Sequence, residues 1–301
     1  MTVARAPALL LVGHGSRDGD GVAQFWQLAN RLRALAPDLE IGCGFIEFAS
    51  PSLNEAIDDL VAGGAESIVA VPLVLLGAGH LKDDGPVALV GGRARHAAVG
   101  FFYARDLGLH PSILAVAEER ARSALSALPG PAPASAGGGT PGPPAAVVVV
   151  GRGSTDPDAN ADLYKAGRLL ADRRRLAGPG ELDEVVPAFV SLAPPSVGEA
   201  LSRARRLGAD RIAVVPYFLF TGILVDRIRE EAADWAARHP GVSVTVGDEL
   251  GPDVRIAALV LERYREALNG DARMNCDGCL YRTELPGYEH RLHAPLPGLR
   301  G

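Results

Sequence analysis

The stretch FIEFASPSLNEAIDDLVAGGAESIVAVP, residues 45–72, decides the fold because it joins two short apolar runs through an amphipathic segment. Ser52 and Glu55 have the spacing of a capping box, and apolar residues then recur on one helical face until two glycines end the pattern. These features predict a strand, a helix near residues 52–63 and a second strand. Such a unit is typical of a parallel sheet covered by helices.

The same arrangement returns in the second half of the chain, where residues 189–216 read FVSLAPPSVGEALSRARRLGADRIAVVP. Two further phrases recur in the same order. VGHGSRD at residues 12–18 is matched by VGRGSTD, and LVLLGAGHLKDD at residues 73–84 is matched by YFLFTGILVDRI. Ordered recurrence of several phrases indicates an internal duplication.

Each half alternates four β-branched runs with four amphipathic segments, which predicts an α/β fold of two tandem similar domains. The predicted strands lie near residues 8–13, 41–48, 67–75, 98–103, 146–151, 185–191, 211–219 and 242–247. The predicted helices lie near residues 20–36, 52–63, 86–96, 111–127, 158–175, 196–207, 225–238 and 253–268.

The repeats also set the expected domain boundaries. Residues 1–128 form the first repeat and residues 146–270 the second. Residues 129–145 are rich in Pro, Gly and Ala and are interpreted as a linker between them. Residues 271–301 lack periodic apolar spacing, which predicts an irregular tail that carries a CxxC pair.

Composition excludes several classes of protein. The chain has 301 residues, 48% of them hydrophobic, and a formal net charge of -6, so nothing supports binding to nucleic acid or to an anionic membrane. The first residues do not have the pattern of a secretory signal, and the apolar run after them is too short to span a membrane. Three cysteines cannot form a disulfide framework. We therefore expect a cytoplasmic protein.

Comparison of the two repeats singles out His14, Glu47 and His80. Each lies at the carboxyl end of a predicted strand or just beyond it, and ligands bind outside the carboxyl ends of strands in open α/β sheets. Two imidazoles and a carboxylate suit a divalent ion such as cobalt, iron or nickel. The alternative for each histidine alone is a capped or solvated residue near a turn. The matched residues of the second repeat, which cannot replace this set, are Arg152, Ser191 and Leu224.

Two loops near these residues are candidates for substrate binding. Gly15, Ser16 and Arg17 precede a predicted helix whose free N–H groups could hold a carboxylate, although Ser16 is equally interpreted as a helix cap. The glycine spacing here fits neither the dinucleotide fingerprint nor a phosphate-binding loop. Lys82 lies in the glycine-rich segment 77–86, which is interpreted either as a moving loop that receives cations or as an ordinary solvated loop.

The GHGSR strand end, the FIEFASPSL junction and the P-x-x-L-x-x-G-x-H-x-x-D-D loop together resemble the sirohydrochlorin chelatases of the class II chelatase superfamily. The resemblance covers about residues 8–268 and is to the long, two-repeat cobaltochelatase type. It implies insertion of cobalt into sirohydrochlorin without ATP, for cobalamin synthesis. It also implies two domains, each with a four-stranded parallel sheet flanked by helices, that face each other across a cleft.

The resemblance implies roles for particular residues. His14 and His80 match the metal-handling histidines of the family, and Glu47 matches its active-site carboxylate. We expect the histidines to hold Co²⁺, Fe²⁺ or Ni²⁺ while Glu47 receives a proton, and we expect Gly15, Ser16, Arg17 and Lys82 to contact substrate. The second repeat departs from the family pattern at all three metal positions, which implies that it forms the opposite wall of one active site.

The tail segment MNCDGCLYR, residues 274–282, resembles the C-terminal M-x-C-x-x-C element of the long cobaltochelatases, which is associated with a [4Fe-4S] cluster. Cys276 and Cys279 supply two thiolates whereas a cluster needs four, so two chains would have to meet as a homodimer. Zinc bound with His290 and His293, or a tail without metal, are the alternatives. Cys43 lies in a predicted strand and is interpreted as a core residue.

Two other functions remain open at this point. One is a ferrochelatase for sirohaem, because histidine and carboxylate ligands accept several first-row ions. The other is a tetrapyrrole or metal carrier without catalysis. A carrier needs ligands but no proton acceptor, so the presence of Glu47 favours an enzyme.

Overall fold

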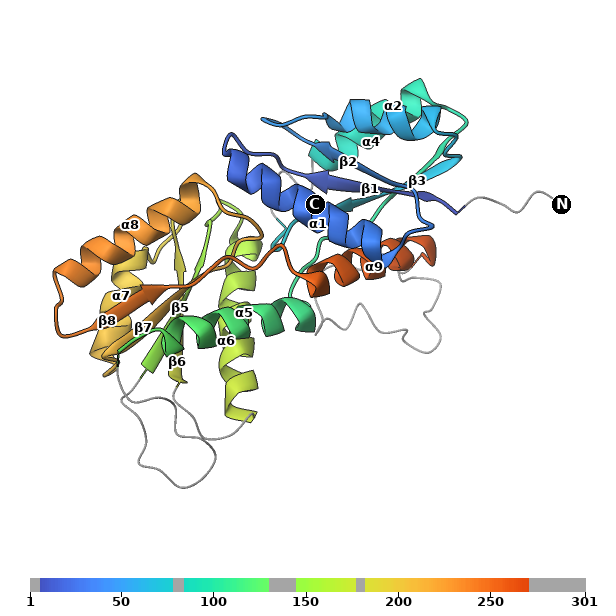
Figure 1. Ribbon diagram of the computed structural model, residues 1–301. Helices are drawn as coiled ribbons and strands as arrows, with labels where there is room; N and C mark the ends of the chain where they lie inside the picture. Colours follow the sequence, from blue (N-terminus) through green and yellow to red (C-terminus); the bar gives the residue numbers. More distant parts are fainter. Residues whose placement is uncertain (1–5, 78–83, 130–144, 177–181, 271–301) are drawn as a thin grey trace, which may run out of the picture.

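A computed structural model describes residues 6–77, 84–129, 145–176 and 182–270 (Figure 1). The chain forms two parallel four-stranded sheets, one in each repeat, with strand orders β2-β1-β3-β4 and β6-β5-β7-β8. The strands of the first sheet are β1 (Ala8–Gly13), β2 (Ile41–Phe45), β3 (Ser67–Pro72) and β4 (Gly100–Tyr103). The strands of the second sheet are β5 (Ala145–Gly151), β6 (Leu182–Phe189), β7 (Arg211–Pro216) and β8 (Ser243–Val246).

Helices connect the strands, and each predicted helix and strand is found near its predicted position. The helices of the first half are α1 (Gly19–Leu35), α2 (Leu53–Ala62), α4 (Asp84–Arg95) and α5 (Pro111–Ser126). The helices of the second half are α6 (Pro157–Leu176), α7 (Val197–Arg206), α8 (Ile223–Ala237) and α9 (Val254–Leu268). The predicted α/β fold with two four-stranded parallel sheets is therefore confirmed.

The central strands are buried on both faces, as expected for parallel sheets covered by helices. All six residues of β1 are buried, and β7 is buried along its whole length. Cys43 is a core residue as predicted, since it is 5% exposed and burial raises the pKa of its thiol to about 11. The thiol is therefore protonated at neutral pH. None of the helices in the described ranges is long and apolar enough to cross a membrane.

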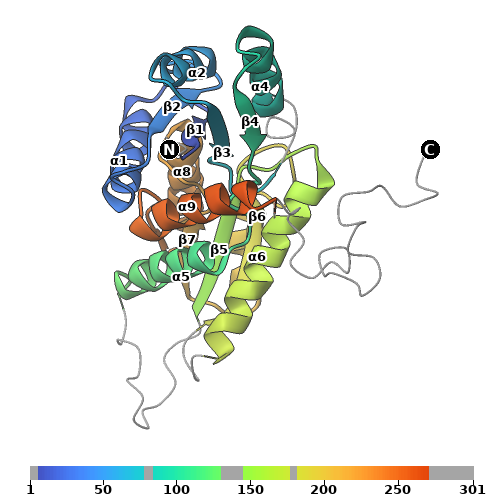
Figure 2. The same ribbon diagram turned by 90° about the vertical axis from the view of Figure 1, so that its right-hand side faces the viewer.

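The last helix of each half packs against the sheet of the other half. Helix α5 lies beside β7, where Arg211 Nη2 donates to the carbonyl of Leu125 at 2.9 Å. Helix α9 lies beside α1 and the first sheet, where the Tyr264 hydroxyl donates to the carbonyl of Pro7 at 2.5 Å. Figures 1 and 2 show α5 and α9 next to each other between the two sheets. We define the first lobe as residues 6–103 with α9, and the second lobe as α5 with residues 145–246.

This exchange changes the domain organisation expected from the sequence. The sequence assigns the helix at 111–127 to the first domain and the helix at 253–268 to the second, but the structure places each in the other lobe. The predicted linker then joins α5 to β5, which are both in the second lobe. The chain passes between lobes at two other segments, residues 104–110 and 247–253. An amphipathic stripe predicts that a helix face is buried, but it does not specify which sheet buries it.

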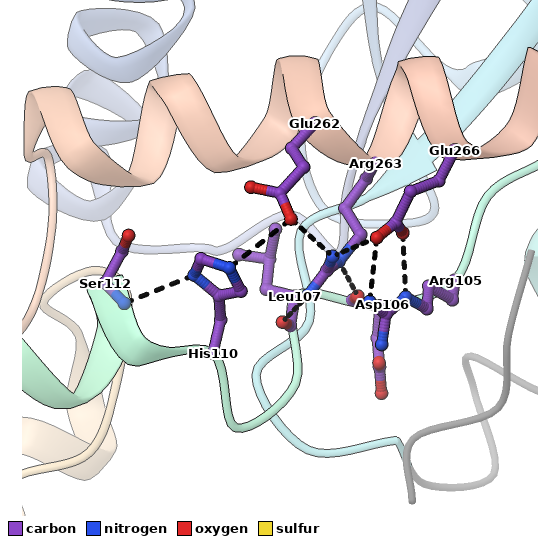
Figure 3. A network of polar contacts seen from close by, with 8 residues as sticks. All are labelled: Arg105, Asp106, Leu107, His110, Ser112, Glu262, Arg263 and Glu266. Atoms are coloured by element: carbon purple, nitrogen blue, oxygen red, sulfur yellow. Dashed lines mark hydrogen bonds and ion pairs between the residues drawn. The ribbon is translucent and has the colours of Figure 1, made fainter. Parts of the chain in front are cut away.

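Each crossover is held by an arginine from the helix that was exchanged. Arg263 of α9 is 1% exposed and donates to the carbonyls of Asp106 (2.9 Å) and Leu107 (2.8 Å) in the first crossover (Figure 3). Arg120 of α5 donates to the carbonyl of Glu249 (3.0 Å) in the second. These charge-assisted bonds fix the chain where it leaves one lobe for the other.

Candidate active site

His14 lies directly after β1, at the carboxyl edge of the first sheet. In the order β2-β1-β3-β4, the chain leaves β1 toward one side and returns to its other side, and ligands bind at such a switch point. The Nδ1 atom of His14 lies 3.3 Å from the carbonyl oxygen of Gly15. A carbonyl oxygen only accepts, so this contact favours hydrogen on Nδ1 and leaves the lone pair of Nε2 for another partner.

Glu47 follows β2, on the neighbouring strand, and its side chain meets that of His14. Glu47 Oε1 lies 3.5 Å from His14 Nε2, and the two side chains are 41% and 38% exposed. Two ligands at about 2.1 Å from one ion are roughly 3.4 Å apart in tetrahedral geometry. The separation of the pair therefore suits two ligands of one divalent ion, or a carboxylate that takes up a proton beside the metal.

Backbone hydrogen bonds fix the positions of these two residues. The bonding between β1 and β2 continues past the strand ends, since Ile46 N donates to Gly13 O at 2.9 Å and Glu47 N donates to His14 O at 3.0 Å. Gly15 has a φ of 94°, and a Cβ placed there would lie 1.7 Å from the carbonyl oxygen of Glu47. Gly15 is therefore required for the close approach that brings His14 and Glu47 together.

The second repeat has the same backbone with different side chains. Gly153 has a φ of 84°, and a Cβ there would lie 1.8 Å from the carbonyl oxygen of Ser191. The matched hydrogen bonds are Val190 N to Gly151 O and Ser191 N to Arg152 O, both 3.0 Å. Arg152 and Ser191 thus occupy the positions of His14 and Glu47. Because the turn forms without them, the imidazole and the carboxylate are not needed for the turn.

Arg17 and Phe48 stand beside the pair. The Arg17 guanidinium lies 4.7 Å from the centre of the Phe48 ring, and that ring is 6.4 Å from the His14 ring. Phe48 is 52% exposed and has a φ of 62°, a left-handed conformation that is costly for a bulky residue. Leu192, at the matched position of the second repeat, has a φ of 61° and is 64% exposed. Sequence reasoning missed both residues because single exposed apolar residues leave no pattern.

Ser16 takes part in the entry to α1 but is not its cap. Its hydroxyl accepts from the N–H of Asp18 at 3.0 Å, and Asp18 is the N-cap, accepting from the N–H of Asp20 at 2.9 Å. The alternative that Ser16 caps the helix is therefore wrong. Asp18 caps the helix because it directly precedes the first helical residue, Gly19, so its carboxylate reaches the N–H groups of the first turn.

The second lobe reaches α1 next to this loop. A Cβ on Gly21 would lie 2.6 Å from the carbonyl oxygen of Thr221, so the loop before α8 packs directly on the first turn of α1. Gln24 then joins the lobes, because its Oε1 accepts from Thr221 N at 2.7 Å and its Nε2 donates to Glu249 Oε1 at 2.6 Å. Glu249 is 6% exposed and also lies 3.3 Å from Arg229. No spacing rule identifies such an interlobe contact from the sequence.

Several predicted residues fall outside the described part of the chain. These are His80, Lys82, Cys276 and Cys279, together with His290 and His293. Among the described residues, no group of three or more His, Cys, Asp or Glu side chains could hold a metal ion. The structure thus brings together two members of the predicted trio, and the cluster at the tail stays a prediction.

The fold and this pair define a class: a duplicated α/β protein in which, among the described residues, the carboxyl edge of the first sheet carries a metal-competent imidazole and carboxylate. Comparison with known proteins identifies the family. Residues 8–124 and 146–267 both match the CbiX family, so each repeat is recognised separately. The chain therefore belongs to the CbiX family.

Individual relatives agree with this assignment over nearly the whole chain. The sirohydrochlorin cobaltochelatase of Priestia megaterium is 34% identical over 92% of this chain and 85% of its own length. The sirohydrochlorin ferrochelatase of Bacillus subtilis is 30% identical over 92% of this chain and 98% of its own. The structure of SirB from Bacillus subtilis with Fe³⁺ superposes with a TM-score of 0.72 at 28% identity, covering 90% of this chain and 99% of that one.

Proposed function

We propose that this chain inserts a divalent metal ion, cobalt, into sirohydrochlorin without ATP. The observation that carries the proposal is the convergence of His14 Nε2 and Glu47 Oε1, 3.5 Å apart, in the repeat whose twin has the same backbone without these side chains. The similarity to a cobaltochelatase and a ferrochelatase supports metal insertion into this macrocycle. The higher identity to the cobalt enzyme supports cobalt as the metal.

The reaction places M²⁺ in the macrocycle and releases the two protons of its pyrrole N–H groups. Neutral His14, with His80 from the neighbouring loop, would hold the incoming ion by imidazole nitrogen. Glu47, beside His14, would accept a proton as a pyrrole nitrogen binds the metal. Gly15, Ser16, Arg17 and Lys82 remain candidates for contacts with substrate carboxylates. Of these candidates, Arg17 is a cation near His14, because its guanidinium lies over the Phe48 ring and that ring is 6.4 Å from the His14 ring.

The first test replaces His14 by Ala and follows cobalt insertion by the visible absorbance of the macrocycle, without ATP. Loss of a metal ligand is expected to lower turnover by about 100-fold or more. Arg152→Ala is the matched control, because it makes the same kind of truncation at the equivalent position of the second repeat. Near-normal turnover in a folded His14→Ala variant would refute the proposed site.

The second test separates the role of Glu47 from that of His14. Glu47→Gln keeps the shape of the side chain but removes its capacity to accept a proton. We expect cobalt affinity, measured by calorimetry without substrate, to change by no more than a few fold while turnover falls by about 100-fold. An equal loss of cobalt affinity and turnover would instead make Glu47 a ligand and would contradict its role as a base.

The ferrochelatase relative favours iron as a second candidate metal. Ligand affinity alone rises along the series from iron to cobalt and nickel, so affinity does not decide which ion is used. Initial rates with cobalt, iron and nickel under anaerobic conditions distinguish the candidates. Faster insertion of iron than of cobalt at equal free metal would assign the chain to sirohaem synthesis, and product in large excess over enzyme would exclude a carrier.

A further inference from the structure

Helices α2 and α4 of the first lobe are joined by a carboxylate that pairs with an arginine and a histidine. Asp58 of α2 lies between an arginine and a histidine at the end of α4: Arg95 Nη2 is 3.1 Å and His96 Nε2 is 2.7 Å from Asp58 Oδ1. The hydrogen bond from His96, together with that from Arg95, lowers the pKa of Asp58. The arginine and histidine of the first lobe therefore have an anionic partner within the same lobe.

The second lobe keeps the arginine and the histidine and lacks the carboxylate. Arg238 and His239 follow α8, as Arg95 and His96 end and follow α4. The sixth residue after the capping serine is Asp58 in α2 but Ser202 in α7. The Ser202 hydroxyl accepts from Trp235 Nε1 at 2.9 Å and donates to the carbonyl of Gly198. A hydroxyl cannot neutralise the adjacent cations.

Helix α7 also gains positive charge on the same side. The seventh and tenth residues after the capping serine are Asp59 and Ala62 in α2, and they are Arg203 and Arg206 in α7. Two other arginines of the second lobe have carboxylate partners on their own helices, in the pairs Arg168–Asp172 and Arg227–Glu231.

By contrast, none of the ion pairs within the described ranges includes Arg203, Arg206 or Arg238. These arginines and His239 line one open hollow of about 1010 Å³. The single carboxylate at its wall, Glu199, already accepts from the N–H and hydroxyl of Ser196, as the capping box of α7.

Other residues that line the hollow are less polar. Tyr164, which is 45% exposed, and the adjacent Pro194 and Pro195 form an apolar side. The ring of His239 stacks on Trp235 with centroids 3.9 Å apart, and Trp235 is 3% exposed. A hollow lined by both arginines and apolar side chains suits a ligand with several anionic groups on an apolar body.

We propose that this hollow binds an organic polycarboxylate, with one carboxylate in the place that Asp58 occupies in the first lobe. Arginine side chains bind carboxylates in bidentate geometry, and three of them face this space without a partner in the described chain. The volume is far larger than one inorganic anion needs. The inference stands on these residues alone and does not depend on the proposed reaction at His14.

The decisive variant restores the missing anion within the lobe. Ser202→Asp reproduces the arrangement of the first lobe and keeps an acceptor for Trp235, and Ser202→Asn is its neutral control. The probe is benzenehexacarboxylate, titrated calorimetrically into the full-length protein. We expect saturable binding to the natural chain, weakened about tenfold by Ser202→Asp and less than threefold by Ser202→Asn. Equal affinity in the natural chain and the Ser202→Asp variant would overturn the proposal.

A second pair of variants tests whether position matters or only net charge. Arg206→Ala and Arg205→Ala remove the same charge from the same helix, but Arg205 does not line the hollow. We expect about tenfold weaker binding for Arg206→Ala and less than twofold for Arg205→Ala. Equal losses would indicate nonspecific attraction and would refute the site. Inorganic phosphate binding as tightly as the probe, or a decaglutamate peptide binding more tightly, would also refute a site for a small polycarboxylate.

Discussion

Replacing Gly15 by Ala tests how the backbone places the active-site pair. Gly15 has a φ of 94°, and the new Cβ would be built 1.7 Å from the carbonyl oxygen of Glu47. Either the loop after β1 or the segment that carries Glu47 must move by well over an ångström. The second repeat provides the matched control, Gly153→Ala. Gly153 has a φ of 84°, and a Cβ placed there would lie 1.8 Å from the carbonyl oxygen of Ser191.

The two substitutions should cost the same stability. A left-handed conformation in a non-glycine residue costs about 1–3 kcal/mol, and relief of the contact adds to it, so we expect about 2–4 kcal/mol for each variant. For a chain of this size that corresponds to a fall in Tm of roughly 5–10 °C. Thermal unfolding followed by circular dichroism measures both variants on the same scale.

The two substitutions should differ in turnover. Movement of Glu47 by about 1 Å relative to His14 is expected to cost about 100-fold in metal insertion, because catalytic groups lose effectiveness steeply with misplacement. Gly153→Ala moves Arg152 and Ser191, which have no role in the proposed reaction, so its turnover at 25 °C should stay within about threefold. Equal losses of turnover in two folded variants would refute the assignment of the chemistry to the first repeat.

Three further predictions concern stability and assembly. Burial raises the pKa of Glu266, but the hydrogen bond from Arg105 and the charges of the neighbouring arginines outweigh it and hold the pKa below its usual value. The ionised carboxylate therefore stabilises the fold above about pH 4.3, and this contribution is lost as the pH falls. In urea titrations at pH 7, Glu266→Gln should lower the free energy of unfolding by about 1–3 kcal/mol. The variant should also lose less stability than the natural chain on acidification, because it lacks the titrating carboxylate. The buried Tyr217 hydroxyl has no hydrogen-bond partner within the described chain, so Tyr217→Phe should raise the free energy of unfolding by about 1 kcal/mol, and a clear loss would show that the hydroxyl is bonded. Cleavage at a protease site inserted between residues 130 and 144 should leave the two fragments together in size-exclusion chromatography, because each carries a helix of the other's lobe; separation would contradict the helix exchange.

Local features were predictable because the sequence specifies them locally. The capping box at Ser52 is present, with Ser52 N donating to Glu55 Oε2 at 2.7 Å, and the duplication correctly matched the turn at Gly15 with the turn at Gly153. The predicted strands also placed His14 and Glu47 at strand ends, and the carboxyl ends of parallel strands meet at one edge of a sheet, where the structure has the two side chains 3.5 Å apart.

Long-range features were not predictable, since they depend on which surfaces meet. Helix α5 has the same apolar stripe whichever sheet it covers, and Arg263 gives no sign in the sequence that it is buried against the first crossover. The left-handed backbone at Phe48 follows from the geometry of the turn rather than from a glycine, so composition does not reveal it.

The exchange of α5 and α9 bears on how such a chain arises. A polypeptide with one repeat would leave one sheet face bare and one helix without a sheet, and two identical copies could satisfy both by trading their last helices. Strict symmetry would oblige both copies to carry the same side chains. Joining them end to end removes that obligation, so one copy can keep His14 and Glu47 while the other accumulates arginines for a separate purpose.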